Sequence, residues 1–307
     1  MSSMKPIPLG KSSLRASRLA YGCWRIGEPG VDGPAAVRAA LDAGFTLFDH
    51  ADIYCDGRGE SIFGEVLRGS SSLRAHVVIA SKCGIRKSGE PRADAPFRYD
   101  FSASHIVSSC NHSLRRLGVT TIDLYQLHRP DWLMDPAEVA RAFDELKRAG
   151  KVREFGVSNF RPSQLDALQA ACPMPLIVNQ VELSLAQLAP FLDGTLDQCL
   201  ADKITPLAWS PLAGGLLGDG AKSLLPSQQS YKVQKIVETL DALAKAHNAS
   251  RTALALAWLL KHPAHIIPII GSTNPASIRE AVKSVNVELS REEWYRPLEA
   301  ARGERLP

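Results

Sequence analysis

The chain lacks the cysteine and histidine patterns of a disulfide-stapled or metal-binding protein. Its six cysteines include no C-x-x-C pair, so we expect reduced thiols in a cytoplasmic protein, most of them acting as small buried hydrophobic residues. Its histidines show no metal-ligand spacing with carboxylates or thiols, and no bound metal is predicted.

Long apolar runs and a marked charge imbalance are also missing. The longest apolar run, residues 252–260, is far too short to span a bilayer, and residues 1–10 have no apolar core of a signal peptide. The 36 basic and 32 acidic residues leave a net charge of +4, whereas nucleic-acid binding usually shows as a basic face or stripe. We therefore expect neither a membrane nor a nucleic-acid partner.

What the chain does contain is an alternation of short apolar runs with amphipathic helical segments. Apolar strands of this kind suit a parallel sheet that helices cover on both faces, and strand–helix alternation is typical of the α/β class. Eight such units fit a (β/α)8 TIM barrel better than an open doubly wound sheet. The predicted strands are 19–22, 45–49, 77–82, 124–128, 152–158, 176–181, 205–209 and 266–270. The predicted helices are 33–43, 60–67, 104–117, 136–149, 162–171, 234–247, 252–261 and 275–285.

The remaining segments complete the predicted architecture. Residues 7–15 precede the first barrel strand and look like an N-terminal β-hairpin plug. Nothing in the composition divides the chain, which predicts a single domain over 1–307. The long segments 83–102 and 210–230 are predicted loops at the C-terminal face of the barrel, where active sites sit.

Titratable side chains stand at the ends of three neighbouring predicted strands. Asp49, Lys82 and His128 follow strands two, three and four, so a barrel would bring them around one pocket. An ion pair between Asp49 and Lys82 would by itself be a structural salt bridge that closes the barrel top. Tyr54 follows in the loop after Asp49, and a neighbouring ammonium would lower its pKa from about 10 and make it a usable acid.

Five runs in register resemble those of the aldo-keto reductase superfamily, in particular its bacterial-type oxidoreductase subgroup. The similarity extends in order from about residue 19 to residue 285, and five ordered motifs at the correct strand ends are far more specific than any one of them. The runs are FDHADIY at 48–54, VIASK at 78–82, DLYQLH at 123–128, GVSNF at 156–160 and IGSTNP at 270–275.

The resemblance implies that the protein reduces aldehydes and ketones to alcohols with a nicotinamide cofactor and without a Rossmann domain. Tyr54 resembles the general acid, Lys82 the group that lowers its pKa, and Asp49 the partner of that lysine. His128 resembles the residue that orients the carbonyl while hydride passes from the nicotinamide. A small-molecule carbonyl substrate is thus the implied partner, and we expect a monomer.

The resemblance also assigns residues to the cofactor and the substrate. The expected cofactor-binding residues are Gly22, Trp24, Asp49, Ser158, Asn159, Gln180, Trp209, Ser210, Pro211, Leu212, Gly214, Ile270, Gly271, Ser272, Thr273, Ser277, Arg279 and Glu280. The expected substrate-binding residues are Trp24, Tyr54, His128 and Trp132.

The adenosine-binding segment departs from the family pattern. Many relatives that prefer NADP carry a lysine where Gly271 stands and an arginine where Ser277 stands. Arg279 lies two positions later and could reach a 2′-phosphate from the same helix, so NADP(H) is the expected cofactor and NAD(H) the alternative.

Two other functions compete with this prediction. A cofactor-bound redox sensor or regulatory subunit would keep the barrel and turn over little. The intact set of four expected catalytic residues, called the tetrad below, argues against it; its members are Asp49, Tyr54, Lys82 and His128. A Schiff-base lyase would use Lys82 as its nucleophile, but the nearby aspartate should keep that lysine charged and poorly nucleophilic.

Overall fold

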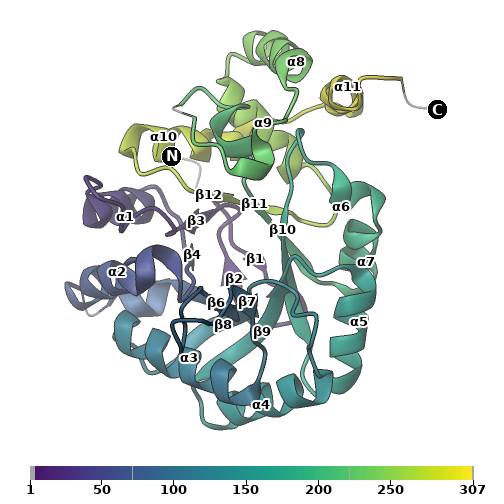
Figure 1. Cartoon of the computed structure of the whole chain (residues 1–307). Coiled ribbons are helices and arrows are strands. Elements are labelled where there is room, and N and C mark those ends of the chain that lie inside the picture. Colours follow the sequence, from purple (N-terminus) through teal and green to yellow (C-terminus); the bar gives the residue numbers. More distant parts are fainter. Residues whose placement is uncertain (1–3, 71, 221, 306–307) are drawn as a thin grey trace.

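Eight parallel strands close into a barrel in the structure, a computed structural model that describes residues 4–70, 72–220 and 222–305. Each strand pairs with the next along the chain, and the last pairs with the first, which confirms the predicted (β/α)8 barrel (Figure 1). The strands are β3 (Ala20–Gly22), β4 (Leu47–Asp49), β5 (Val78–Cys83), β8 (Ile122–Leu127), β9 (Val152–Ser158), β10 (Leu176–Glu182), β11 (Thr205–Trp209) and β12 (Ile267–Ile270).

Helices surround this barrel on the outside (Figure 1). They are α1 (Gly33–Asp42), α2 (Arg58–Arg68), α3 (Ala103–Leu117), α4 (Pro136–Arg148), α5 (Pro162–Ala171), α6 (Ala189–Leu192), α7 (Thr195–Asp202), α8 (Gln234–Ala246), α9 (Arg251–Leu260), α10 (Pro275–Val282) and α11 (Arg291–Arg302).

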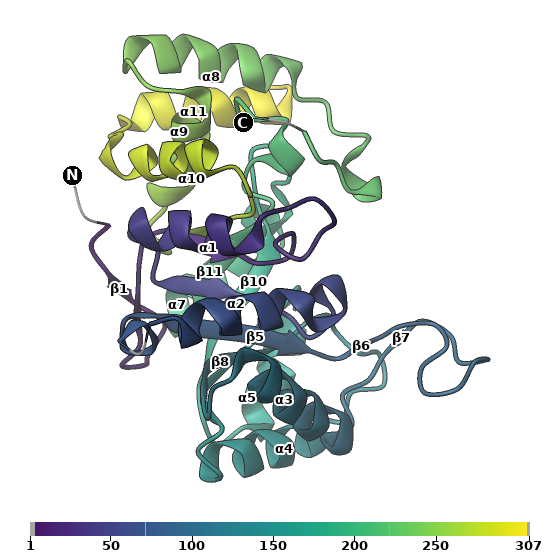
Figure 2. The same cartoon turned by 90° about the vertical axis from the view of Figure 1, so that its left-hand side faces the viewer.

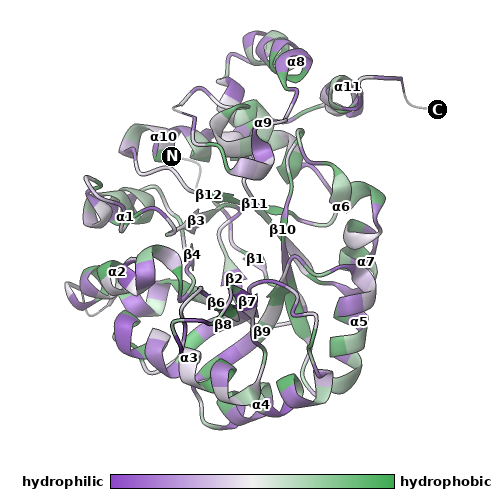
Figure 3. Ribbon diagram, viewed as in Figure 1, coloured by the Kyte–Doolittle hydropathy of each residue, from purple (hydrophilic) through white to green (hydrophobic). Residues whose placement is uncertain are grey.

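Helix α4 shows why these segments are helical. The side chain of Asp135 accepts a hydrogen bond from the backbone N–H of Ala137 and caps the helix, and Pro136 occupies the first turn. Val139 and Phe143, four residues apart, are buried on the face that meets the barrel. Hydrophilic and hydrophobic segments alternate along the surrounding helices in Figure 3, as amphipathic helices require.

An N-terminal hairpin closes one end of the barrel. Strands β1 (Ile7–Pro8) and β2 (Arg15–Ala16) pair antiparallel, and Leu9 and Leu14 pack inside the barrel with the inward side chains of its strands. The predicted hairpin plug is therefore confirmed, and Figure 2 shows β1 at the end opposite to β6 and β7.

The other end of the barrel is polar inside. Successive strand residues point to opposite faces. Ala80 therefore packs in the barrel interior while Ile79 packs outside against the helices. Two residues further along β5, Lys82 occupies the next inward position and is fully buried. The C-terminal strand ends thus supply a ring of polar side chains in which a site can form.

One hairpin and the helices α6, α7 and α11 lie outside the strands and helices predicted from the sequence. A second hairpin, β6 (Ile85–Arg86) and β7 (Arg98–Tyr99), lies within the expected loop 83–102, and α11 follows the last predicted helix. The loop 210–230 is irregular apart from two short 3-10 turns, and its residue 221 lies outside the described part of the chain. In the described ranges, no helix is both long and apolar enough to cross a bilayer. The single domain over 1–307 stays a prediction.

Candidate active site

Lys82 lies at the centre of the candidate site. Its Nζ is 2.7 Å from Asp49 Oδ2, 3.0 Å from the Tyr54 hydroxyl and 2.8 Å from the backbone oxygen of His50. Strand register explains this convergence, because Asp49 ends β4 and Lys82 stands near the end of β5, its neighbour. Tyr54 opens the 3-10 turn Tyr54–Gly57 that follows β4.

This geometry determines the donor and the acceptor in each hydrogen bond of Lys82. An ammonium group has three protons and no lone pair, so Lys82 donates to all three oxygens. The Tyr54 hydroxyl therefore accepts from Lys82 and keeps its own proton available for another acceptor. Asp49 accepts from Lys82 through Oδ2 and from Gln180 Nε2, at 2.8 Å, through Oδ1. The carboxylate thus has a partner on each oxygen, and the predicted ion pair is present.

Burial, however, changes the electrostatics from those expected. It works to lower the pKa of Lys82, but Asp49 and Tyr54 raise it above its ordinary value, so the lysine stays charged. Burial also raises the pKa of Tyr54, and the opposing effect of Lys82 does not overcome it. The expectation that Lys82 brings the pKa of Tyr54 below its usual value is therefore wrong for the protein without a cofactor.

The direction of this shift predicts a titration. A hydroxyl whose pKa is raised holds its proton to higher pH than free tyrosine, so Tyr54 should give no tyrosinate below about pH 10. The difference in ultraviolet absorbance between the cofactor-free wild type and Tyr54→Phe isolates its ionisation. A tyrosinate signal of Tyr54 near neutral pH would contradict the shift.

His128 faces Tyr54 across the site. The two rings meet edge to face with centroids 5.6 Å apart. Burial, followed by the charges of Lys82 and Arg129, lowers the pKa of His128 well below its ordinary value. The imidazole is therefore neutral at physiological pH and can donate one hydrogen bond from its protonated nitrogen.

An ion pair with a buried carboxylate lies beside the turn that carries Tyr54. Glu60, fully buried at the start of α2, accepts from Arg116 Nε at 2.7 Å and from Ser81 Oγ at 2.5 Å. Gly57 ends the turn at φ +83°, and a Cβ there would lie 2.6 Å from the Arg116 side chain. The turn can therefore approach Arg116 only with glycine at this position. The sequence alone did not reveal this network, because its members come from three separate elements.

The expected nicotinamide-binding residues already contact one another. Asn159, at φ +63°, donates from Nδ2 to Ser158 Oγ and to the His128 backbone oxygen, and accepts from Trp209 Nε1 at 2.9 Å. Gln180 donates to Asp49, which leaves its second amide proton and its own oxygen for a ligand. One free donor and one free acceptor match the carboxamide of a nicotinamide, so this donor set fits the group.

The Trp24 indole packs closely against Gly271 at the edge of the site. A Cβ at Gly271 would lie 2.5 Å from the Trp24 indole nitrogen, and one at Gly22 would lie 3.7 Å from its ring. The indole therefore covers the two strand ends, beside Ile270, and is 37% exposed. The structure places Trp24 at the edge of the site, and its contact with a cofactor or a substrate stays a prediction.

The loop after β11 is held by a buried glutamine. Gln228 donates from Nε2 to Ser210 Oγ at 2.9 Å and to Glu182 at 2.5 Å. Gly214 adopts φ +66°, with Ser223 O only 2.6 Å from the place of a Cβ. The segment with Ser210, Pro211, Leu212 and Gly214 is thereby fixed beside Trp209 at the end of β11. No sequence motif pointed to Gln228.

The expected adenosine-binding residues lie at the beginning and along the length of α10. Ser272 and Thr273 precede the helix, and Ser277 and Arg279 lie within it. Arg279 is exposed, while Glu280 pairs with Lys283 at 2.7 Å. The arrangement leaves the guanidinium of Arg279 accessible to an anionic ligand.

One predicted substrate residue lies apart from the others. Trp132 is 91% exposed, so it forms no wall of the site in this structure, and its contact with a substrate stays a prediction. Arg129, between His128 and Trp132 in the chain, was missed although it directly follows a predicted catalytic residue. Its guanidinium carbon lies 5.3 Å from the centre of the Trp209 ring.

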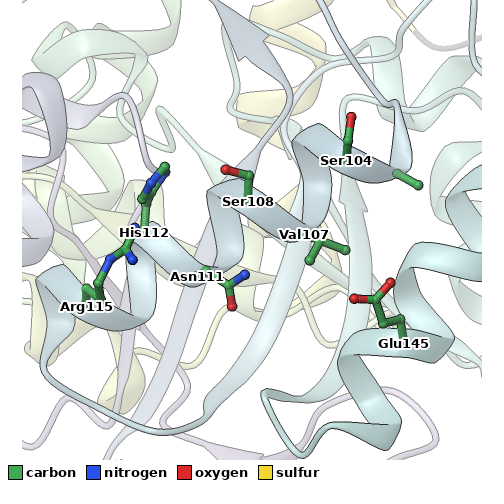
Figure 4. Close-up of a pocket in the computed structure, with 8 residues that line it drawn as sticks. Ser104, Val107, Ser108, Asn111, His112, Arg115 and Glu145 are labelled. Carbon is green, nitrogen blue, oxygen red and sulfur yellow. The ribbon is translucent and has the colours of Figure 1, made fainter.

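A polar hollow elsewhere on the surface competes weakly as a site. It lies between α3 and α4 and is lined by Ser104, Ser108, Asn111, His112, Arg115 and Glu145, among others (Figure 4). None of the tetrad residues lines it. The described residues contain no group of three potential metal ligands, here or elsewhere. The chemistry-bearing cluster is therefore the one at the barrel end.

Comparison with known proteins agrees with this geometry. The sequence model of the Aldo/keto reductase family matches residues 18–300. A 6-dehydroglucose reductase of Novosphingobium aromaticivorans is 42% identical over 97% of this chain and 96% of the relative. The oxidoreductase YdhF of Escherichia coli is 38% identical over 95% of each chain. The chain belongs to the aldo-keto reductase family, whose members act on small-molecule carbonyl compounds.

Solved structures give the same result. A glycerol dehydrogenase from Gluconobacter oxydans superposes with a TM-score of 0.86 at 28% identity, covering 100% of this chain and 98% of that one. The barrel, its hairpin plug and the family were thus predicted correctly from the sequence.

Proposed function

We propose that this protein reduces aldehydes and ketones to alcohols with NADP(H), and that Tyr54 donates the proton. The observation that carries the proposal is the contact of one buried ammonium, Lys82 Nζ, with both Asp49 and the Tyr54 hydroxyl. Lys82 donates its three ammonium protons to oxygens of Asp49, His50 and Tyr54. The Tyr54 hydroxyl accepts one of these hydrogen bonds, so its own proton is not donated to Lys82. That proton is available to a carbonyl oxygen in the site.

Each residue of the tetrad has a separate task in this proposal. A bound reduced nicotinamide would supply the hydride. Tyr54 protonates the developing alkoxide, and the charge of Lys82 stabilises the tyrosinate that remains. Asp49 keeps Lys82 protonated and in place, and neutral His128 donates a hydrogen bond that orients the carbonyl. A charged Lys82 is also a poor Schiff-base nucleophile, which opposes the lyase alternative.

Arg279 is the proposed determinant of the preference for NADP(H). Charge-assisted hydrogen bonds to a 2′-phosphate contribute about 1.5–3 kcal/mol, so Arg279→Ala should weaken NADPH binding about 10- to 100-fold. NADH, which lacks that phosphate, is the internal control and should bind the variant as it binds the wild type. Fluorescence titration with both cofactors measures the effect, and equal losses for both would show that Arg279 does not recognise the phosphate.

The wild-type titration tests the cofactor proposal itself. NADPH should bind more tightly than NADH, and a panel of aldehydes and ketones should then show which carbonyl compounds support its consumption. Two relatives are named 6-dehydroglucose reductase, and one solved relative is a glycerol dehydrogenase. These names support hydroxylated carbonyl compounds as the first substrates to try.

A further inference from the structure

Arg129 occupies a position that the tetrad does not explain. It follows His128 directly after β8, and its guanidinium lies over the Trp209 ring, 5.3 Å from the centroid. Trp209 is itself tied to Asn159, whose amide donates to the His128 backbone. The arginine is therefore anchored between the residues expected to hold the nicotinamide and those expected to hold the carbonyl.

No carboxylate of the described residues pairs with this guanidinium. The nearest acid in the chain, Asp131, accepts instead from the backbone N–H groups of Phe101 and Leu133, each at 2.9 Å. Arg25 provides the contrast: it also lies over an indole, that of Trp24, but it is paired with Glu28 at 3.2 Å. Arg129 thus brings a positive charge to the site that the described residues do not neutralise.

The electrostatics place this charge beside the reacting groups. Burial has the largest effect on the pKa values of Tyr54 and His128. The positive charge of Arg129 lowers both pKa values, with a smaller effect than the charge of Lys82. A charge acts in this way only on groups that are near. The guanidinium therefore lies near Tyr54 and His128 as well as over the Trp209 ring.

We propose that Arg129 binds oxygen atoms of the substrate away from its reacting carbonyl, so that the preferred substrates carry a carboxylate or neighbouring hydroxyl groups. A guanidinium presents its donors in a planar fork that matches paired oxygens. The guanidinium carbon lies over the Trp209 ring, and no carboxylate of the described residues occupies its donors. The inference rests on the proposed carbonyl reductase function and names the substrate class of the same site.

Three four-carbon aldehydes test the proposal: butanal, succinic semialdehyde and erythrose. Arg129→Leu should lower kcat/KM by about 10- to 100-fold for an aldehyde that carries a carboxylate or hydroxyls, which is the range expected for lost charge-assisted hydrogen bonds. Any loss for butanal should be smaller than the loss for these aldehydes, because an alkyl chain gives the guanidinium nothing to bind. Arg129→Lys should restore only part of the loss, since an ammonium lacks the planar fork.

The pattern of losses decides the matter. A loss for succinic semialdehyde alone identifies a carboxylate as the ligand, and a loss for erythrose alone identifies hydroxyl groups. Equal losses for all three aldehydes, or no loss for any, would overturn the proposal. Arg161→Leu is the matched control, because it removes an exposed arginine from the loop between β9 and α5 at the same end of the barrel.

A binding measurement separates this proposal from the reductase function. Succinate cannot be reduced, and its binding can be followed by the tryptophan fluorescence of the cofactor-free protein and of the protein with NADP(H). Arg129→Leu should weaken succinate binding about 10-fold or more in either form if the ligand is a carboxylate. If the wild type consumed NADPH with none of the aldehydes but bound succinate through Arg129, only the reductase proposal would fail.

Discussion

Tyr54→Phe is expected to lower the rate of carbonyl reduction by about 100- to 10,000-fold, the range for loss of a positioned general acid. The phenyl ring keeps the packing against His128 but has no proton to give. Lys82 cannot replace it directly, because its other two contacts, with Asp49 and the His50 backbone, hold the ammonium in place. The rate is measured by the loss of NADPH absorbance with an aldehyde in excess.

Two controls make this result specific. NADPH affinity should be unchanged in Tyr54→Phe, since Tyr54 is not among the proposed cofactor contacts. Tyr99→Phe, in the hairpin at the same end of the barrel, should retain wild-type turnover. If Tyr54→Phe kept more than about a tenth of the activity, proton donation by Tyr54 would be refuted.

Removal of Lys82 is expected to have the largest effect on stability. Lys82→Met leaves the carboxylate of Asp49, which is 2% exposed, without its cation. An uncompensated buried charge of this kind costs about 3–5 kcal/mol, so the free energy of unfolding should fall by that amount. Urea unfolding of the cofactor-free protein measures it.

A double variant shows whether the charge is the cause. In Asp49→Asn/Lys82→Met the side chain at position 49 is a neutral amide that can still interact with Gln180, so most of the lost free energy of unfolding should return. If the double variant were as unstable as Lys82→Met, lost packing rather than an unpaired charge would explain the effect. Neither variant should reduce carbonyl compounds at the wild-type rate, because both lack the ammonium beside Tyr54.

The barrel could be predicted because its local patterns agree with the global fold. Runs such as 77–80 are apolar on both faces, as a strand between a core and a helix layer requires. Helix α11 was not predicted from the sequence, because Pro297 interrupts its helical pattern and few of its residues are buried. It is fixed by distant packing, with the Trp294 ring stacked on Trp258, 5.0 Å between centroids. The β6–β7 hairpin was not predicted either, since strands of two residues are too short to show a hydrophobic alternation in the sequence.

The tetrad could be predicted because strand ends in a barrel point to one place. Alternation along the strand also separated His50, which packs against Phe63 outside the barrel, from Asp49 inside it. The pKa of Tyr54 could not be predicted, because its direction depends on how deeply packing buries the hydroxyl. The charge of Lys82 alone would lower the pKa of Tyr54, but the desolvation of the buried hydroxyl raises it by more.

Arg129 and Trp132 show that side-chain positions at the rim of the site could not be predicted from the sequence either. Both follow His128 in the chain, and only the aromatic residue was predicted to meet a substrate. In the structure Trp132 is exposed, while Arg129 lies over Trp209. Loop residues three positions apart can point in different directions, and no strand or helix period fixes their orientation.

The most direct test of the proposed mechanism is a single-turnover experiment with the wild-type protein. Enzyme saturated with one equivalent of NADPH is mixed with an excess of aldehyde, and the decay of bound NADPH is followed alongside Tyr54→Phe. The mechanism predicts decay to one equivalent of NADP and one of alcohol in the wild type, and decay slower by about 100-fold or more in the variant. Tight binding of NADPH with no decay for any carbonyl compound would contradict it and would instead indicate a cofactor-bound sensor.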